Sequence, residues 1–136
     1  MHRRLAIATV ALALMMFFGG IASAGSPHFI DNAFSSNISG NTVTVSGKEA
    51  GLGDEAQVHI VVTATASCIN PGGNHPQAAN KESVTAEGDF PVQNGKAEFT
   101  LTLTATFQPE CSPPMSVSWS DIVVTDTTNG LTQTLP

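Results

Sequence analysis

The stretch Val58-His59-Ile60-Val61-Val62-Thr63-Ala64-Thr65-Ala66-Ser67-Cys68 decides the fold class of this 136-residue chain. Apolar side chains occupy every second position, and mostly polar side chains fill the positions between them. A period of two over this length predicts a strand with one buried face, and its β-branched residues favour the same structure. His59 falls on the outward face, where we expect a solvated histidine. The strand ends at one of only two cysteines.

A second clear alternation runs from Ala97 to Cys111 and predicts a long strand that also ends in a cysteine. Two cysteines favour a disulfide over free thiols if the chain is exported, and a zinc site would need paired histidines at ligand spacing. Because a disulfide holds its Cα atoms within about 7 Å, a Cys68–Cys111 bond brings the two strand ends together. The two strands then point the same way and face each other across a sandwich.

Weaker patterns divide the first part of the chain. Residues 29–34 and 42–46 predict short strands, and the polar residues between them predict a loop. The three glycines within 47–55 predict a break. A weaker strand starts near Val84 and is interrupted at Gly88-Asp89.

The C-terminal part shows turns between alternating runs. Asn94-Gly95 and residues 126–130 predict hairpin turns, and 131–135 predicts the last strand. Trp119 shares its face with Met115 and Val117, so we expect it to be buried. The alternation then changes parity, which predicts a β-bulge near Ser120-Asp121.

Together these patterns predict an all-β fold, an antiparallel immunoglobulin-like β-sandwich of about seven strands with one disulfide. Trp119 follows both cysteines, unlike the tryptophan of antibody domains, so the likeness concerns architecture only. The loop 68–81 and the loop 111–114 would meet at one end of the sandwich, which we call the Cys pole.

The N-terminus has the composition of a secretory signal peptide. Arg3 and Arg4 precede the apolar residues 5–21, and Ala22-Ser23-Ala24 forms a small-residue cleavage site. We expect cleavage after Ala24, a secreted, extracellular protein, and a single domain at residues 25–136, with the signal peptide at residues 1–24. An uncleaved membrane anchor is the rival interpretation, and the cleavage site argues against it.

The charge balance excludes two classes of partner. Three lysines against eleven acidic residues leave a net charge of −8 on residues 25–136. Such a surface repels phosphate backbones and anionic lipid, so we expect neither nucleic acid nor, after signal cleavage, a membrane as partner.

No motif for catalysis, a cofactor or a metal occurs, so we expect a non-enzymatic protein with no catalytic, cofactor-binding or metal-ligating residues. Asp54-Glu55 offers too few oxygens for calcium by itself. The candidate partner-binding residues lie in the loop 68–81, where two prolines and the disulfide stiffen a polar segment. They are Asn70, Asn74, His75, Gln77, Asn80 and Lys81. The alternative is that these residues only satisfy turn geometry.

Short landmarks spread over nearly all of residues 25–136 carry a resemblance. They are Ser-Pro-His-Phe-Ile at 26–30, Lys-Glu-Ala-Gly-Leu-Gly at 48–53, the segment 68–81, Cys-Ser-Pro-Pro at 111–114 and Thr-Asp-Thr-Thr-Asn-Gly at 125–130. In these the chain resembles a group of small secreted β-proteins of unknown function from high-GC Gram-positive bacteria. The resemblance implies an extracellular location and assigns no site roles.

The leading functional hypothesis is an extracellular β-sandwich that binds a protein or cell-wall component through the Cys-pole loops. A small secreted hydrolase is the first alternative. The second is a protease inhibitor that presents the stiff loop between Cys68 and Lys81 to a protease.

Overall fold

The computed structural model describes residues 26–72 and 80–136, so the predicted signal peptide at 1–24 lies outside the described residues. Within these residues, eight strands form two antiparallel sheets. The elements are β1 (His28–Phe29), the 3-10 helix η1 (Asp31–Ala33), β2 (Ser35–Ser39), β3 (Thr42–Ala50), β4 (Gln57–Ile69), β5 (Lys81–Pro91), β6 (Ala97–Thr104), β7 (Ser116–Asp126) and β8 (Leu131–Thr134).

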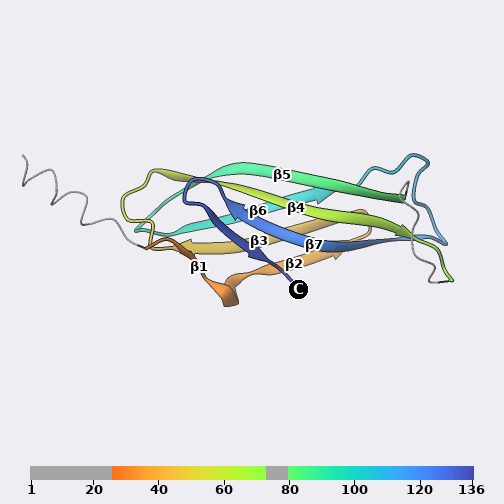
Figure 1. Ribbon diagram of the computed structural model, residues 1–136, viewed down its shortest axis with the longest axis horizontal. Helices are drawn as coiled ribbons and strands as arrows, with labels where there is room; N and C mark the ends of the chain where they lie inside the picture. The colour runs from red at the N-terminus through yellow and green to blue at the C-terminus, as the bar shows by residue number, and fades with distance from the viewer. Residues whose placement is uncertain (1–25, 73–79) are drawn as a thin grey trace, which may run out of the picture.

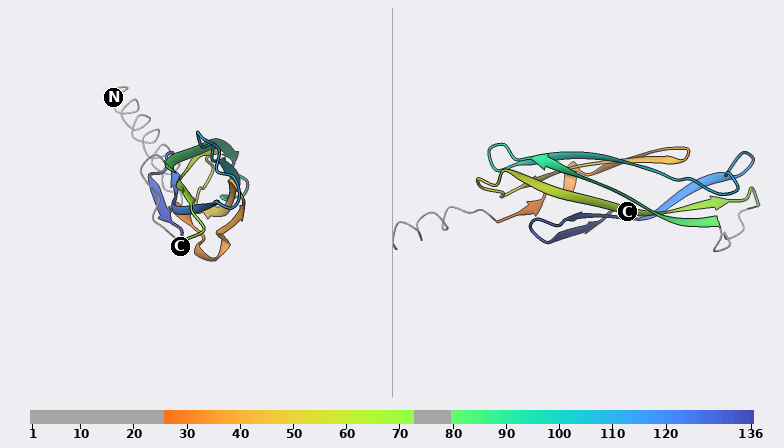
Figure 2. Two further views of the ribbon diagram at one scale, coloured as in Figure 1. Left: turned by 90° about the vertical axis from the view of Figure 1, so that its right-hand side faces the viewer. Right: turned by 90° about the horizontal axis from the view of Figure 1, so that it is seen from above.

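The two sheets pack face to face along an elongated molecule (Figure 1). In the first sheet β3 is central, with β6 on one side and β1 and β2 on the other. The second sheet has the order β5-β4-β7-β8. Seen end-on, the strands surround a common interior (Figure 2). The predicted β-sandwich is therefore confirmed, with eight strands in place of about seven.

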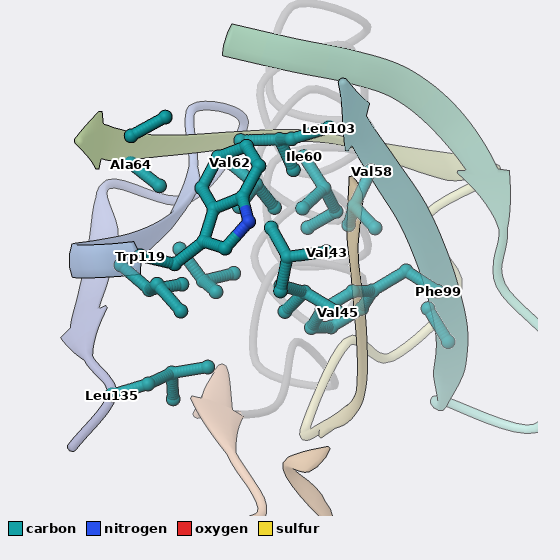
Figure 3. Packing of buried hydrophobic residues seen from close by; sticks show 14 of the residues in the cluster. Val43, Val45, Val58, Ile60, Val62, Ala64, Phe99, Leu103, Trp119 and Leu135 are labelled. Carbon is teal, nitrogen blue, oxygen red and sulfur yellow. The ribbon is translucent and has the colours of Figure 1, made fainter. Parts of the chain in front are cut away.

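The core is formed by the inward faces that the alternation predicted. Val58, Ile60 and Val62 of β4 face Val43 and Val45 of β3, and all five are fully buried (Figure 3). On β6 the odd-numbered residues face inward, and Phe99 and Leu103 among them are buried. Trp119 is 9% exposed and packs against this cluster, so its predicted burial is confirmed.

The polar segment after Phe34 is a strand, and its prediction as a loop was wrong. All five residues of β2 are exposed, and β2 pairs with β3 from Ser35↔Ser46 to Ser39↔Thr42. An edge strand needs no apolar alternation when its stabilisation comes from backbone pairing with a neighbour. The predicted strand 29–34 is also shorter, because β1 stops at Phe29 and η1 follows.

Two glycines that predicted interruptions lie inside continuous strands. The ring of Phe99 covers Gly47 of β3, where an added Cβ would lie 2.5 Å from the Phe99 Cζ atom. Gly88 of β5 lies beneath Phe90, but an added Cβ there would lie 3.5 Å from the nearest ring atom. These glycines mark close packing in a strand rather than a turn.

Substituting Gly47→Ala is expected to destabilise the domain by about 1–3 kcal/mol, the usual cost of overpacking a core. The Phe99 ring cannot move aside easily, because it is 2% exposed and lies 6.1–6.2 Å from the rings of Phe29, Phe34 and Phe90. Thermal unfolding should show a midpoint lower by roughly 5–10 °C. Gly88→Ala is the matched control, since its Cβ makes only an ordinary contact. Equal midpoints for the two variants would contradict this account of Gly47.

The predicted turn and bulge are both confirmed. Asn94 and Gly95 have φ values of 55° and 75°, as a type I′ hairpin turn requires. In β7 the register with β4 shifts between the pairs Thr63↔Val123 and Thr65↔Ser120. Asp121, within this shift, has a φ of 52°. The bulge lets β7 keep its apolar side chains inward on both sides of the parity change.

Candidate functional site

The Cys pole is built around the predicted disulfide, which is confirmed. Cys68 near the end of β4 bonds to Cys111, and their Cα atoms lie 5.9 Å apart. β4 and β6 belong to different sheets and both run toward this end of the molecule, as predicted (Figure 1). Strand β6 stops at Thr104, however, so Cys111 lies in the connection to β7 rather than on a long strand. The bond therefore ties the second sheet to a loop that leaves the first.

Three of the six predicted binding residues lie at this pole. Asn70 follows β4 and is exposed, Asn80 is half-buried, and Lys81 is the exposed first residue of β5. Because Ser67 near the end of β4 pairs with Lys81 at the start of β5, these residues lie at the same end of the second sheet. Asn74, His75 and Gln77 lie outside the described residues.

A groove of about 890 Å³ opens beside the disulfide. Its walls come from both sheets: the β2–β3 turn, the chain after β6, and the first residues of β7. The lining residues are Gly40, Asn41, Ala105, Thr106, Phe107, Gln108, Glu110, Cys111, Pro113, Met115, Ser116 and Val117. Of the predicted binding residues that the structure describes, Asn70, Asn80 and Lys81, none is among them. Sequence reasoning missed this groove. Residues 35–40 were predicted as a loop, so nothing in the sequence indicated that the turn at Gly40 and Asn41 lies beside the Cys pole.

Three hydrogen bonds hold the groove in shape. The Ala105 N–H donates to the Asn41 carbonyl at 2.8 Å, and the Asn41 side-chain amide donates back to the Ala105 carbonyl at 3.3 Å. The Trp119 Nε1–H donates to the Gly40 carbonyl at 3.4 Å. These bonds fix the β2–β3 turn against the chain after β6 and against β7, so the groove is preorganised.

The chemistry of the groove suits binding more than reaction. Among the described residues that line it, Glu110 alone is charged, and the others offer hydroxyl, amide, backbone or apolar contacts. Within residues 26–72 and 80–136, no three His, Cys, Asp or Glu side chains come together as a metal site would require.

His59 lies on the outward face, as predicted, but its ring is not simply solvated. Its Nδ1 lies 2.8 Å from Asp89 Oδ1, and its Nε2 lies 3.0 Å from Glu87 Oε1. The hydrogen bond to Asp89 and then that to Glu87 raise the pKa of His59. Both carboxylates come from β5 through the pairing His59↔Asp89, which the sequence pattern did not reveal. Since both ring nitrogens are occupied, the cluster ties the surfaces of β4 and β5 together.

A second acidic feature, which the sequence analysis missed, lies near the end of the sandwich opposite the Cys pole. Glu49 of β3 and Asp126 of β7 are both fully buried. Both residues continue an inward parity, Glu49 after Val43 and Val45, and Asp126 after Val124. An acidic residue at an inward-facing position of a strand is the sequence signal that could have identified this pair. For Glu49 the signal was missed because a break in the strand was predicted at residues 47–55.

Glu49 holds a proton that forms a hydrogen bond to Asp126. Neither Glu49 oxygen has a partner while both groups are ionised, because carboxylates only accept hydrogen bonds. Burial first, and then the interaction with Asp126, raise the pKa of Glu49 to about 9, so the protonated carboxyl donates to Asp126.

Asp126 keeps its negative charge. Burial opposes ionisation, but hydrogen bonds from Glu49, Asn129 and Thr128 outweigh it and lower the Asp126 pKa. Its Oδ1 accepts the Thr128 N–H at 2.8 Å, and its Oδ2 accepts the Asn129 side-chain amide at 2.8 Å. The pair therefore organises the turn between β7 and β8. No substrate can reach two fully buried carboxyls, so the pair is structural in this conformation.

Comparison of the chain with protein-family models, with curated proteins and with solved structures found no significant match. In the part of the chain that the structure describes, no helix is long and apolar enough to cross a bilayer.

Proposed function

We propose that the chain is a secreted, non-enzymatic β-sandwich protein that binds an extracellular protein or a cell-wall component through its Cys pole. The observation that carries the proposal is the groove of about 890 Å³ between the β2–β3 turn and the start of β7. Its volume lies in the range of small-molecule pockets, and its open form suits a segment of a larger partner.

The rigidity of the groove supports binding. The disulfide anchors one wall, and the bonds of Asn41 and Trp119 anchor the other. A partner would lose little binding energy in ordering these loops. The signal-peptide pattern and the disulfide support an extracellular location.

Capture with residues 25–136 immobilised tests the proposal, using culture medium and isolated cell wall of the producing organism. Ser116→Arg places a bulky charge in the groove, and Thr85→Arg places the same side chain on the exposed surface of β5. We expect the parent and Thr85→Arg to retain the same partner and Ser116→Arg to lose it. Equal capture by both variants would contradict binding at the groove.

Two activity measurements separate this proposal from the alternatives. Turnover of a substrate panel that is lost in His75→Ala would indicate a small secreted hydrolase. Inhibition of secreted proteases by the parent would indicate an inhibitor that presents the loop between Cys68 and Lys81.

A further inference from the structure

The first half of β7 has an open edge. β7 pairs with β4 from Ser116 to Asp126, apart from the bulge, but β8 covers only residues 123–126. The last bond on that side runs from the Leu135 N–H to the Ile122 carbonyl. Among the described strands, none pairs with the outer edge of residues 116–120. The same residues begin at the groove, which Ser116 and Val117 line.

The register shows which backbone groups face this edge. The Thr127 N–H donates to the His59 carbonyl, so Ile60 and Asp126 form a non-hydrogen-bonded pair in the β4–β7 ladder. The even-numbered residues of β4 consequently turn their backbone groups away from β7. Two of these even-numbered residues, Ala66 and Cys68, lie opposite Trp119 and Val117 of β7. The backbone groups of Trp119 and Val117 therefore point away from β4. Two N–H and two C=O groups therefore point into the open edge.

We propose that this edge pairs with an extended, basic segment of a partner polypeptide, which lies antiparallel to β7 in line with β8 and extends the second sheet. The proposal rests on the function proposed above and names the class of partner. Main-chain pairing supplies the affinity in this mode of recognition, and alternate side chains supply the specificity. Side chains on the inward parity of the segment would meet the apolar groove residues Phe107 and Met115.

Charge selects a basic partner. Asp121 follows the edge directly and is exposed, and Glu110 lines the groove with Met115. No lysine, arginine or histidine lines the groove among the described residues. With a net charge of −8 on residues 25–136, long-range attraction favours a cationic segment. A second copy carries the same charge and is repelled, which argues against self-association at this edge.

Synthetic peptides test the proposal directly. The probe is Lys-Val-Thr-Val-Thr-Val-Lys, and the comparison peptide has glutamate in place of both lysines. The chain holds one tryptophan, Trp119 on this edge, so a change in its fluorescence reports binding. We expect the basic peptide to bind, more weakly at high salt. The acidic peptide should bind at least fivefold more weakly, because it replaces two exposed charge contacts, each worth up to about a factor of five, with repulsions.

Backbone methylation of the peptide distinguishes strand pairing from charge attraction alone. In an antiparallel pair the valines that share the face of Trp119 direct their N–H groups to β7, and the threonine N–H groups point away. Methylating the valine nitrogens should weaken binding by roughly tenfold or more, and methylating the threonine nitrogens should leave it unchanged. Equal effects of the two methylations, or equal binding of the acidic peptide, would overturn the proposal.

A protein variant separates failure of this proposal from failure of the proposed function. Val117→Pro removes an N–H that β4 does not use, and such a proline is tolerated on an edge. We expect it to lose the peptide while its thermal midpoint stays close to that of the parent. If the captured partner still binds Val117→Pro but not Ser116→Arg, the groove binds without strand pairing, and this proposal fails alone. Because the methylated peptides use the parent protein, the test holds even if Val117→Pro does not fold.

Discussion

Replacing Cys68 and Cys111 with alanine is expected to lower the thermal midpoint of unfolding by roughly 15 °C. The bond joins residues 43 apart in sequence, and the chain-entropy model gives such a loop about 4 kcal/mol. A domain of this size has about 5–15 kcal/mol in total, so the variant should be marginally stable. The loss should affect the Cys pole first, because the bond ties the loop after β6 to the second sheet.

Chemical reduction provides the control for this prediction. Reducing the parent should lower its midpoint to that of the Cys68→Ala/Cys111→Ala variant, and the variant should not respond to the reductant. A variant midpoint within a few degrees of the oxidised parent would contradict the stabilising role of the bond. Mass spectrometry of the parent should find no free thiol.

Glu49 is expected to make the protein less stable as the pH rises from about 4.5 to 9. The folded state holds a proton on Glu49 up to its pKa of about 9, whereas the unfolded state releases it near the ordinary value of 4.5. The free energy of unfolding should therefore fall by up to about 1.4 kcal/mol per pH unit within this interval. The lowered pKa of Asp126 acts at the acid end, where stability is lost as the pH falls below its ordinary value of 3.8.

Urea unfolding between pH 5 and 9 measures this slope. Glu49→Gln keeps a hydrogen-bond donor toward Asp126 without the titrating proton, so we expect it to remove most of the slope and to be more stable than the parent at pH 9. Glu98→Gln neutralises an exposed glutamate on the neighbouring strand and should keep the slope. A parent profile that is flat over this range, or an unchanged slope in Glu49→Gln, would show that Glu49 is not the responsible group.

The contribution of His59 to the pH dependence of stability must be distinguished from that of Glu49, because the pKa of His59 is raised from 6.5. Its raised pKa also makes stability decline as the pH rises through the folded-state value, after full effect below the ordinary 6.5. Because the ring and both carboxylates are solvent-accessible, solvent screens this cluster. His59→Gln should therefore leave most of the slope in place.

The sequence by itself determined those features that depend on neighbours along the chain. The period-two alternation identified β4 and β6 and assigned their inward faces. Asn94-Gly95 identified its turn, and the parity change identified the bulge at Asp121. The expected Cys68–Cys111 bond was enough to place β4 and β6 in opposite sheets with their ends together, although Cys111 lies beyond the end of β6.

The tertiary structure alone decided the features that depend on residues distant in sequence. Ser35–Ser39 is a strand because β3 lies beside it, and Gly47 belongs to a strand because Phe99 needs the space of its missing side chain. Of the candidate site, the sequence placed Asn70, Asn80 and Lys81 at the Cys pole. It could not reveal the groove or the open edge of β7, since both are set by where other strands end. A local pattern records whether a residue faces inward, but the partner it meets there is chosen by the packing of the two sheets.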